Sequence, residues 1–346
     1  MPPRGAPRRL HLTILVCAGP LSHNEQTVIP IRSSENPPSD PLSDVLSLLE
    51  VQSLLSRRLE ASVPWALRFP EYKHMKFGGV IEGFRWVWIE GVTEPLKLEA
   101  GDFYLLTNGA PYCFATDLHT EVVDGMTFMA EHLEADGVVR YGNGQPRTVG
   151  TGGRFTFDDE MSGLLLKSLP PLIHIRGNLS QARALRSALE LIGFETEATK
   201  PGASAVGASL CTIVLVNILR AYLLADERPE GWLGALADPQ IGSVLGLMHG
   251  NIAKRWKVKD LAYEVGMSRT TFAERFKAMV GLAPLEYLTR WRMTIARSAL
   301  RRDDSNLATI AENIGYESDT AFSSSFKRMF GCSPGSYRTQ MSRAAL

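Results

Sequence analysis

A pattern of eleven residues occurs twice near the C-terminal end of this sequence, and it restricts the fold more than any other feature. The copies are 49 residues apart up to their first glycine and 50 apart after it, so one residue is inserted at that turn. Chance does not easily match glycine, proline and serine together with apolar positions, which indicates a duplicated structural unit. The first copy comprises Val258, Leu261, Ala262, Val265, Gly266, Ser268, Phe272, Phe276, Gly281, Pro284 and Tyr287, and the second comprises Leu307, Ile310, Ala311, Ile314, Gly315, Ser318, Phe322, Phe326, Gly331, Pro334 and Tyr337.

Each copy predicts a helix, a turn and a second helix. The apolar residues at its start are spaced i, i+3, i+4 and i+7, which places them on one helical face. Gly266 and Gly315 follow where a helix ends in left-handed backbone, and Ser268 and Ser318 stand where a hydroxyl caps the next helix. That second helix has an apolar back, with two phenylalanines, and a polar front. A capped helix of this kind can enter the major groove of DNA.

The stretch 284–302 between the copies predicts one continuous helix that begins at Pro284, a residue suited to a first helical turn. Such a helix spans roughly 27 Å, close to the ~34 Å between successive major-groove faces on one side of a duplex. A rigid connector could therefore set two helices into adjacent turns of one DNA molecule. The connector also carries the basic residues Arg290, Arg292, Arg297, Arg301 and Arg302.

Two stretches, WKVKDLAYEVGMSRTTFAERFKAMVGLAPLEYLTRWRM and IAENIGYESDTAFSSSFKRMFGCSPGSYR, resemble the DNA-binding domain of AraC/XylS-type transcription regulators. In that family two helix-turn-helix units share a linker helix, and their second helices read double-stranded DNA. The resemblance implies base-facing roles for Thr270, Ala273 and Glu274 in the first unit and for Asp319, Thr320 and Ser324 in the second. Arg269, Lys277 and Lys327 suit phosphate contacts, and Ser268 and Ser323 complete the expected DNA-binding set. The second unit is poor in Arg and Gln, which favours readout of DNA shape.

The formal net charge of zero hides an uneven distribution. Residues 240–346 contain 16 Lys/Arg and 9 Asp/Glu, a net charge of +7, whereas residues 1–239 contain 21 and 28, a net charge of −7. The basic part is the part with the repeat, as binding to phosphates requires. Random scatter of the charges is the alternative explanation, and this coincidence disfavours it.

A length of 346 residues predicts about two domains. Residues 1–40 are rich in proline, which predicts a disordered tail or a start codon placed too early. Their faint likeness to a signal peptide is broken by His11 and Thr13. We find no other apolar run of 18 or more residues, so no membrane span and a cytoplasmic location are expected. The four cysteines show no Cys-x-x-Cys spacing and indicate neither a zinc ribbon nor a disulfide framework.

The N-terminal part changes from helical to alternating patterns. Asp40–Arg58 predicts a helix with Val45, Leu48, Leu49, Leu54 and Leu55 on one side. Residues 63–160 contain short β-rich runs broken by Gly, Pro and Asn, which indicate a sandwich or small barrel. The phrase LEAGDFYLLTNGAP resembles the Gly-Asp turn and following strand of a cupin. Residues 41–178 thus resemble the cupin-like sensor domain of one AraC-type subfamily.

The interior of this domain has two interpretations. Metal-binding cupins need His and Glu on two strand motifs, and the His-x-His of the first motif is absent, so neither a metal nor another cofactor is expected. The remaining interior is predicted to hold aromatic residues, which form either an ordinary core or a pocket for a small effector. These residues are Phe84, Trp86, Trp88, Phe103, Tyr104 and Tyr112.

Residues 179–230 predict two helices, of which the second, Ser209–Leu224, is apolar on nearly every face. Core packing within one chain and a dimer interface both account for such a helix, and the family resemblance implies a homodimer formed through this region. Residues 231–243 contain Gly, Asp and Pro and predict a linker. The DNA-binding domain follows at residues 244–342.

The predicted fold class is therefore α+β, with a cupin-like β-barrel or sandwich followed by helices and then an all-α domain with two helix-turn-helix motifs. The predicted function is a sequence-specific DNA-binding transcription regulator under the control of a small-molecule effector, and not an enzyme. The resemblance implies an activator that recruits RNA polymerase. The alternative is a metal-dependent cupin enzyme, an isomerase or dioxygenase, with a DNA-binding tail.

Overall fold

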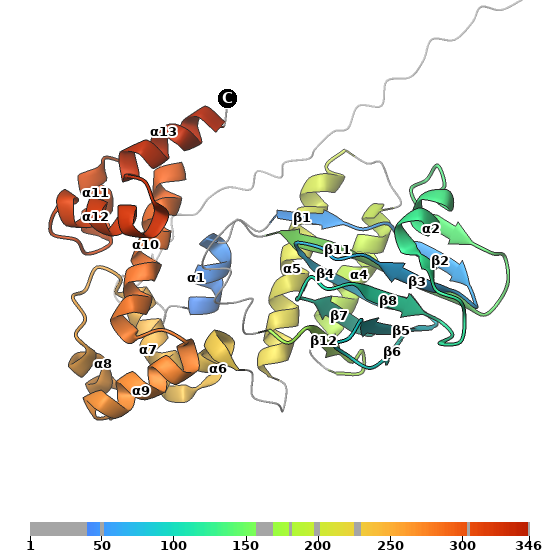
Figure 1. The fold of residues 1–346 in the computed structure, drawn as a ribbon, viewed down its shortest axis with the longest axis horizontal. Coiled ribbons are helices and arrows are strands. Elements are labelled where there is room, and N and C mark those ends of the chain that lie inside the picture. The colour runs from blue at the N-terminus through green and yellow to red at the C-terminus, as the bar shows by residue number, and fades with distance from the viewer. Residues whose placement is uncertain are drawn as a thin grey trace, which may run out of the picture. The chain divides into compact units, whose positions relative to one another are not determined.

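The computed structural model describes residues 40–48, 52–156, 169–179, 182–196, 201–224, 230–302 and 305–344. Of the tail predicted over residues 1–40, all but the last residue lies outside this part. A short helix comes first, then the strands with one helix among them, then two long helices and an all-helical C-terminal part (Figure 1). The predicted α+β class is confirmed.

Two β-sheets form a sandwich that stays open over the described residues (Figure 1). Its strands are β1 (Gln52–Leu55), β2 (Leu59–Ser62), β3 (Ala66–Phe69), β4 (Met75–Glu82), β5 (Phe84–Ile89), β6 (Leu96–Glu99), β7 (Phe103–Leu106), β8 (Tyr112–Ala115), β9 (Val123–Asp124), β10 (Val139–Tyr141), β11 (Arg147–Thr156) and β12 (Leu172–Ile175). The larger sheet has the order β10-β2-β11-β4-β7-β12, with β1 paired to β11, and the smaller has the order β6-β5-β8-β3-β9. Val80 from the larger sheet and Val87 from the smaller share one buried apolar cluster, as two packed sheets require.

The helices are α1 (Pro41–Leu48), α2 (Gly125–Glu131), α4 (Ala182–Thr196), α5 (Ala203–Leu223), α6 (Gly231–Ala237), α7 (Pro239–Gly250), α8 (Val258–Glu264), α9 (Arg269–Val280), α10 (Pro284–Arg302), α11 (Leu307–Asn313), α12 (Asp319–Phe330) and α13 (Pro334–Ala344). α4 and α5 cover the face of the larger sheet that points away from the sandwich interior. By length and composition, Ala205–Leu223 could cross a membrane. Its residues Cys211, Val214 and Ile218 are nevertheless buried in the protein core.

The helix predicted for Asp40–Arg58 is wrong in its second half. α1 ends at Leu48, and the chain then forms β1, which pairs antiparallel with β11. Pairing with β11 satisfies the backbone N–H and C=O groups of this segment, and strand preference depends strongly on such neighbours. The helical spacing of the leucines is thus overridden by tertiary structure.

The prediction that residues 231–243 form a linker is also wrong, because this segment forms α6 and the start of α7. Trp232 and Leu233 are buried, and α6 packs against α9. Asp238 caps α7 by accepting hydrogen bonds from the backbone N–H groups of Gln240 and Ile241. The Asp-Pro pair therefore marks a boundary between two packed helices rather than an exposed connection.

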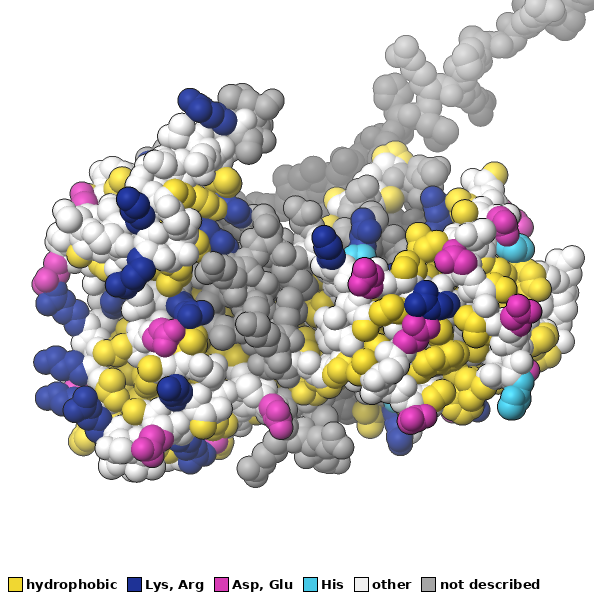
Figure 2. Space-filling model, viewed as in Figure 1, with side chains coloured by type: hydrophobic (Ala, Val, Ile, Leu, Met, Phe, Trp, Pro, Cys, Tyr) yellow, Lys and Arg dark blue, Asp and Glu magenta, His cyan; other side chains and the backbone are white. Residues whose placement is uncertain are grey.

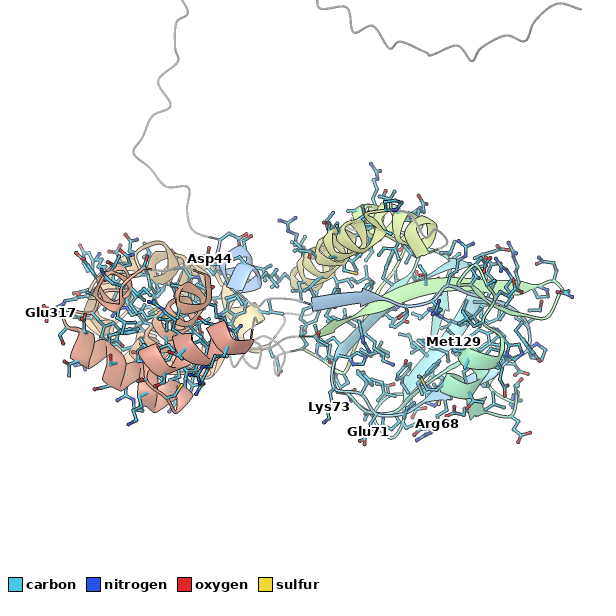
Figure 3. The ribbon with its side chains drawn as sticks, turned by 90° about the horizontal axis from the view of Figure 1, so that it is seen from above. Asp44, Arg68, Glu71, Lys73, Met129 and Glu317 are labelled. Carbon is cyan, nitrogen blue, oxygen red and sulfur yellow. The ribbon has the colours of Figure 1, made fainter. Side chains whose placement is uncertain are left out.

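His249 on α7 lies at the centre of a buried hydrogen-bond chain that reaches α1. Its Nδ1 lies 3.0 Å from the Asp44 carboxylate, and its Nε2 lies 2.7 Å from the Tyr287 hydroxyl. The Trp232 indole N–H donates to the same hydroxyl over 3.0 Å. Because Tyr287 accepts that bond, its own hydrogen goes to Nε2, and the neutral imidazole donates from Nδ1 to Asp44. Figure 3 labels Asp44 on α1.

Acidification is expected to destabilise the fold through His249. Burial lowers the pKa of His249, and the Asp44 carboxylate only partly opposes that effect. In the unfolded chain a histidine titrates near 6.5, so at lower pH the unfolded state binds a proton that the folded state does not. The contribution of His249 to the free energy of unfolding is therefore full above about pH 6.5 and is lost progressively as the pH falls below that value.

Urea unfolding at about pH 7.5 and about pH 5 measures this effect, with His119→Gln as the matched control because His119 is an exposed histidine. His249→Gln should lose less stability between the two pH values than the wild type does, whereas His119→Gln should follow the wild type. The same pH dependence in His249→Gln and in the wild type would contradict the assignment.

Candidate nucleic-acid interface

The two predicted repeats fold into two equivalent helical lobes. The first lobe consists of α8, α9 and the start of α10, and the second consists of α11, α12 and α13. Their aromatic cores contain equivalent pairs of rings. The ring centres of Phe272 and Phe276 lie 5.7 Å apart, and those of Phe322 and Phe326 lie 5.9 Å apart. The ring centres of Phe276 and Tyr287 lie 5.9 Å apart, and those of Phe326 and Tyr337 lie 5.7 Å apart. The internal repeat of the sequence is thus a repeat in space.

The turn of each lobe is built as predicted. Gly266 has a φ of 66° and Gly315 has a φ of 81°, both in the left-handed region. The hydroxyl oxygens of Ser268 and Ser318 accept hydrogen bonds over 3.1 and 3.2 Å from the backbone N–H three residues later. Both serines are therefore N-caps, and they fix the starts of α9 and α12, which we call the reader helices.

The reader helices direct polar side chains to solvent. Their buried sides hold the phenylalanine pairs, which are fully inaccessible. Most predicted DNA-binding residues lie on the opposite side: Arg269, Thr270, Glu274 and Lys277 of α9, and Asp319, Thr320, Ser324 and Lys327 of α12, are exposed, whereas Ala273 and Ser323 are half-buried. Each lobe therefore offers one polar helical face of the kind that can lie in a major groove.

The connector between the lobes is α10, whose bounds match the predicted stretch 284–302. Most of its arginines fasten the lobes instead of extending into solvent. Arg292 donates to the carbonyl of Ile252 over 2.8 and 2.9 Å, and Arg301 donates to the Tyr337 hydroxyl over 2.7 Å. The Arg297 guanidinium lies 5.2 Å from the ring centre of Phe330. Burial lowers the pKa of Arg292.

A basic segment that begins before α8 and ends in its first turn was not predicted from the sequence. It comprises the exposed residues Lys254, Arg255, Lys257 and Lys259. Figure 2 shows Lys and Arg side chains gathered at the edge where Figure 1 draws α8 and α9. Four cations within six residues are a pattern typical of segments that bind phosphates. In contrast, Arg275 of α9 pairs with Asp238 over 2.5 Å and is held within the domain.

The two lobes meet where the chain between α7 and α8 approaches the turn of the second lobe. A Cβ placed on Gly315 would lie 2.3 Å from the carbonyl oxygen of Ala253, whereas one on Gly266 would meet nothing within 4 Å. Arg255 forms an ion pair with Glu317 across the same junction. Figure 3 labels Glu317. The close backbone contact fixes the relative placement of the two reader helices.

The sandwich holds a cavity of about 900 Å³. Tyr104 and Tyr112, two of the predicted effector-binding residues, line it. Phe84, Trp86 and Trp88 occupy the partly exposed positions of β5 and do not line it. Phe103, the sixth aromatic residue predicted for the interior, is buried in the cluster that includes residues of α4 and α5. The alternate positions of β5 point inward and place Arg85 in the wall. Within the described residues, no three His, Cys, Asp or Glu side chains gather as a metal-binding group.

Comparison with known proteins gives matches for both parts of the chain. A family model described as Cupin matches residues 40–224, and another described as Helix-turn-helix domain matches residues 261–340. A protein of Streptomyces lividans, named as an AraC-like transcription regulator, is 40% identical over 300 residues, which cover 86% of this chain and 98% of the relative. The HTH-type transcriptional regulator AlkR of Acinetobacter baylyi is 32% identical over 249 residues, which cover 70% of this chain and 80% of AlkR.

Among solved structures, the DNA-binding domain of AdpA in complex with a target DNA is 32% identical. The match covers 30% of this chain and 92% of that domain, with a TM-score of 0.29.

Proposed function

Since this chain belongs to the AraC family of helix-turn-helix transcription regulators, with a cupin domain preceding its DNA-binding domain, we propose that it is a cytoplasmic activator controlled by a small-molecule effector. The observation that carries the proposal is the pair of equivalent lobes, each with a capped reader helix and an exposed polar face. α10 joins them and, at ~1.5 Å per residue, spans roughly 27 Å, a length that suits adjacent major-groove faces of one duplex.

Some side chains of the reader helices contact base edges, and others contact phosphates. Thr270, Glu274 and the half-buried Ala273 face base edges in the first lobe, and Asp319, Thr320 and Ser324 do so in the second. Arg269, Lys277 and Lys327 bind phosphates, together with the basic strip 254–259. Phosphate contacts give affinity without sequence information, whereas base contacts give specificity. The second lobe, with few long polar side chains, contributes through DNA shape.

Replacing Lys327 or Glu274 by alanine tests this division. Lys327→Ala should weaken binding to all DNA sequences and reduce the slope of log affinity against log salt by about 0.9, because one phosphate contact is lost. Glu274→Ala should instead change the preference at particular base pairs by about 1–3 kcal/mol. Mobility-shift titrations on a randomised-site library at two salt concentrations measure both quantities.

Lys97→Ala serves as the control for these titrations, because Lys97 is exposed on the sandwich and not on a reader helix. It should leave both the affinity and the preference unchanged. If Lys327→Ala and Glu274→Ala had the same effect on every sequence, the division between phosphate and base contacts would be refuted.

The remaining parts of the proposal concern dimerisation and control. Leu191 on α4 and Ile213 on α5 are exposed to 53% and 46%, although both are large apolar residues. Such residues suit an interface between two copies of the chain, so we assign homodimerisation to α4 and α5.

The effector binds in the cavity of the sandwich, with Tyr104 and Tyr112 in its wall, and shifts the population of DNA-competent arrangements. The activated dimer recruits RNA polymerase.

A further inference from the structure

Two positively charged side chains lie in the wall of the sandwich cavity, and each is surrounded by aromatic rings. The Arg85 guanidinium lies 4.4 Å from the ring centre of Phe114 and 5.4 Å from that of Tyr104. The Lys76 ammonium donates a hydrogen bond to the Tyr112 hydroxyl over 2.8 Å and lies over the ring of that tyrosine. Aromatic faces hold cations in place without neutralising their charge.

Neither cation forms an ion pair with a carboxylate among the described residues. Arg85 is only 5% exposed, and a guanidinium at such a depth is normally paired. The cavity wall contains four Lys or Arg residues and one acidic residue, the exposed Glu71, which leaves three net positive charges. Figure 3 labels Glu71 on the segment that follows β3.

Four polar atoms of the same wall are buried without a hydrogen-bond partner in the described part of the chain. They are Arg85 Nε, Trp65 Nε1, Tyr72 OH and Thr151 Oγ1, and all four residues line the cavity. An unpaired buried polar group costs roughly 1–3 kcal/mol, and native proteins contain few of them. Their gathering around one cavity shows that this part of the interior is polar.

Small residues keep room for these groups. A Cβ on Gly150 would lie 3.0 Å from a terminal nitrogen of Arg85, and one on Gly78 would lie 2.4 Å from the Tyr104 hydroxyl. Another part of the wall is apolar, with Met126, Met129 and Leu133 contributed by α2 and the turn after it. Figure 3 labels Met129 on α2. The cavity thus has a cationic, hydrogen-bonding region and an apolar region.

We propose that this cavity binds an amphipathic organic carboxylate, whose anionic head is held by Arg85 and Lys76 and whose apolar body lies against the methionines of α2. A planar guanidinium matches a carboxylate with two parallel hydrogen bonds. The volume of about 900 Å³ falls in the range of small-molecule sites, ~300–1,000 Å³. The inference rests on the proposed effector control, and it names the chemical class of the effector.

The pH dependence of binding gives additional support. Burial, with a smaller contribution from Arg154, lowers the pKa of Lys76 to about 8. The other ionisable groups near its ammonium are Tyr72, His74 and Tyr112, which are uncharged at neutral pH in this environment, since burial lowers the pKa of His74 and raises those of both tyrosines. An anion that needs protonated Lys76 should therefore bind with constant affinity between about pH 6, where its carboxylate is fully ionised, and about pH 8, and should weaken by up to about tenfold per pH unit above that range.

Isothermal titration of the full chain, without DNA, tests the proposal. The probes are octanoate, phenylpropionate and naphthoate, each compared with its methyl ester, which has nearly the same shape and no charge. At least one acid should bind about tenfold or more tightly than its ester, because the ester cannot form charge-assisted hydrogen bonds. Arg85→Met and Lys76→Met should each weaken that acid by about tenfold or more and leave the ester unaffected.

Arg68→Met is the matched control, because Arg68 lies exposed on β3 and pairs with Glu90 over 2.7 and 2.9 Å. It should bind the acid as the wild type does. If Arg85 serves binding and not folding, Arg85→Met should keep or raise the midpoint temperature of unfolding of the unliganded protein. If Arg85→Met does not fold, Lys76→Met alone decides the outcome.

The inference is overturned if no acid binds better than its ester, or if binding survives both substitutions. Adding the bound acid to the mobility-shift assay distinguishes a failure of the cavity assignment from a failure of the proposed function. An acid that binds through Arg85 without changing DNA affinity would uphold the cavity assignment and refute effector control by that acid. Sequence-specific DNA binding with no acid binding would uphold the regulator and refute the cavity assignment.

Discussion

Replacing Phe322 by alanine is expected to lower the free energy of unfolding of the second lobe by about 3–5 kcal/mol, because the ring is fully buried. Its centre lies 5.9 Å from that of Phe326 and 6.0 Å from that of Tyr316, so alanine would leave a cavity between α11 and α12. Hydrogen exchange of the α12 amides measures the loss directly. The footprint on DNA should shorten at one end, since α12 is one of the two reader helices.

The repeat supplies controls for this prediction. Phe272→Ala removes the equivalent ring from the first lobe, which belongs to a different apolar cluster, so it should reduce the protection of α9 and spare that of α12. Ser324→Ala, on the exposed face of α12, should change stability by no more than about 0.5 kcal/mol. Equal loss of protection in both lobes after Phe322→Ala would show that the lobes do not unfold separately.

Replacing Gly315 by alanine is the second change with a large expected effect. Left-handed backbone alone costs alanine about 1–2 kcal/mol, and the added Cβ would lie 2.3 Å from the carbonyl oxygen of Ala253. Because this neighbour is a backbone atom, the second lobe must move away from the segment before α8. We expect the affinity for a site that spans both lobes to fall by tenfold or more, with a smaller change in affinity for a half-site read by the first lobe.

Gly266→Ala separates the two causes. Gly266 has a similar φ of 66° but open space around its Cβ position, so alanine there should cost only the backbone term. Titration of both variants against a full site and a half-site checks the prediction. If Gly266→Ala impaired the full site as much as Gly315→Ala, contact between the lobes would not be the cause.

The C-terminal helices could be predicted because their determinants are local. A glycine stop, a serine cap and a phenylalanine pair each act within one or two helical turns, and α10 begins at Pro284 as expected. The errors fall where distant partners decide. The leucines after α1 enter a strand because β11 lies beside them. Residues 231–243 form helices that are held by distant contacts, since the buried Trp232 donates a hydrogen bond to Tyr287.

The position of Arg85 shows why the cavity could not be found from the pattern of β5. In the run FRWVWI both alternating sets are largely apolar, so periodicity does not say which set points inward. The aromatic set predicts an interior, whereas the other set contains an arginine. The structure buries Val87 and Ile89 completely and carries Arg85 inward with them. A local rule is thus broken at a position where we propose binding, which is where such exceptions are expected.

α1 comes before the sandwich in the sequence, but it packs against helices of the C-terminal part. Leu42 and Val45 precede the sandwich in sequence, yet they are buried in contact with the helices of the C-terminal half. A protease fragment beginning at α6 would lose this cover and would expose the imidazole of His249. Such a fragment should gain solubility when a synthetic peptide of residues 40–48 is added in trans, much as two pieces of a divided protein complement each other.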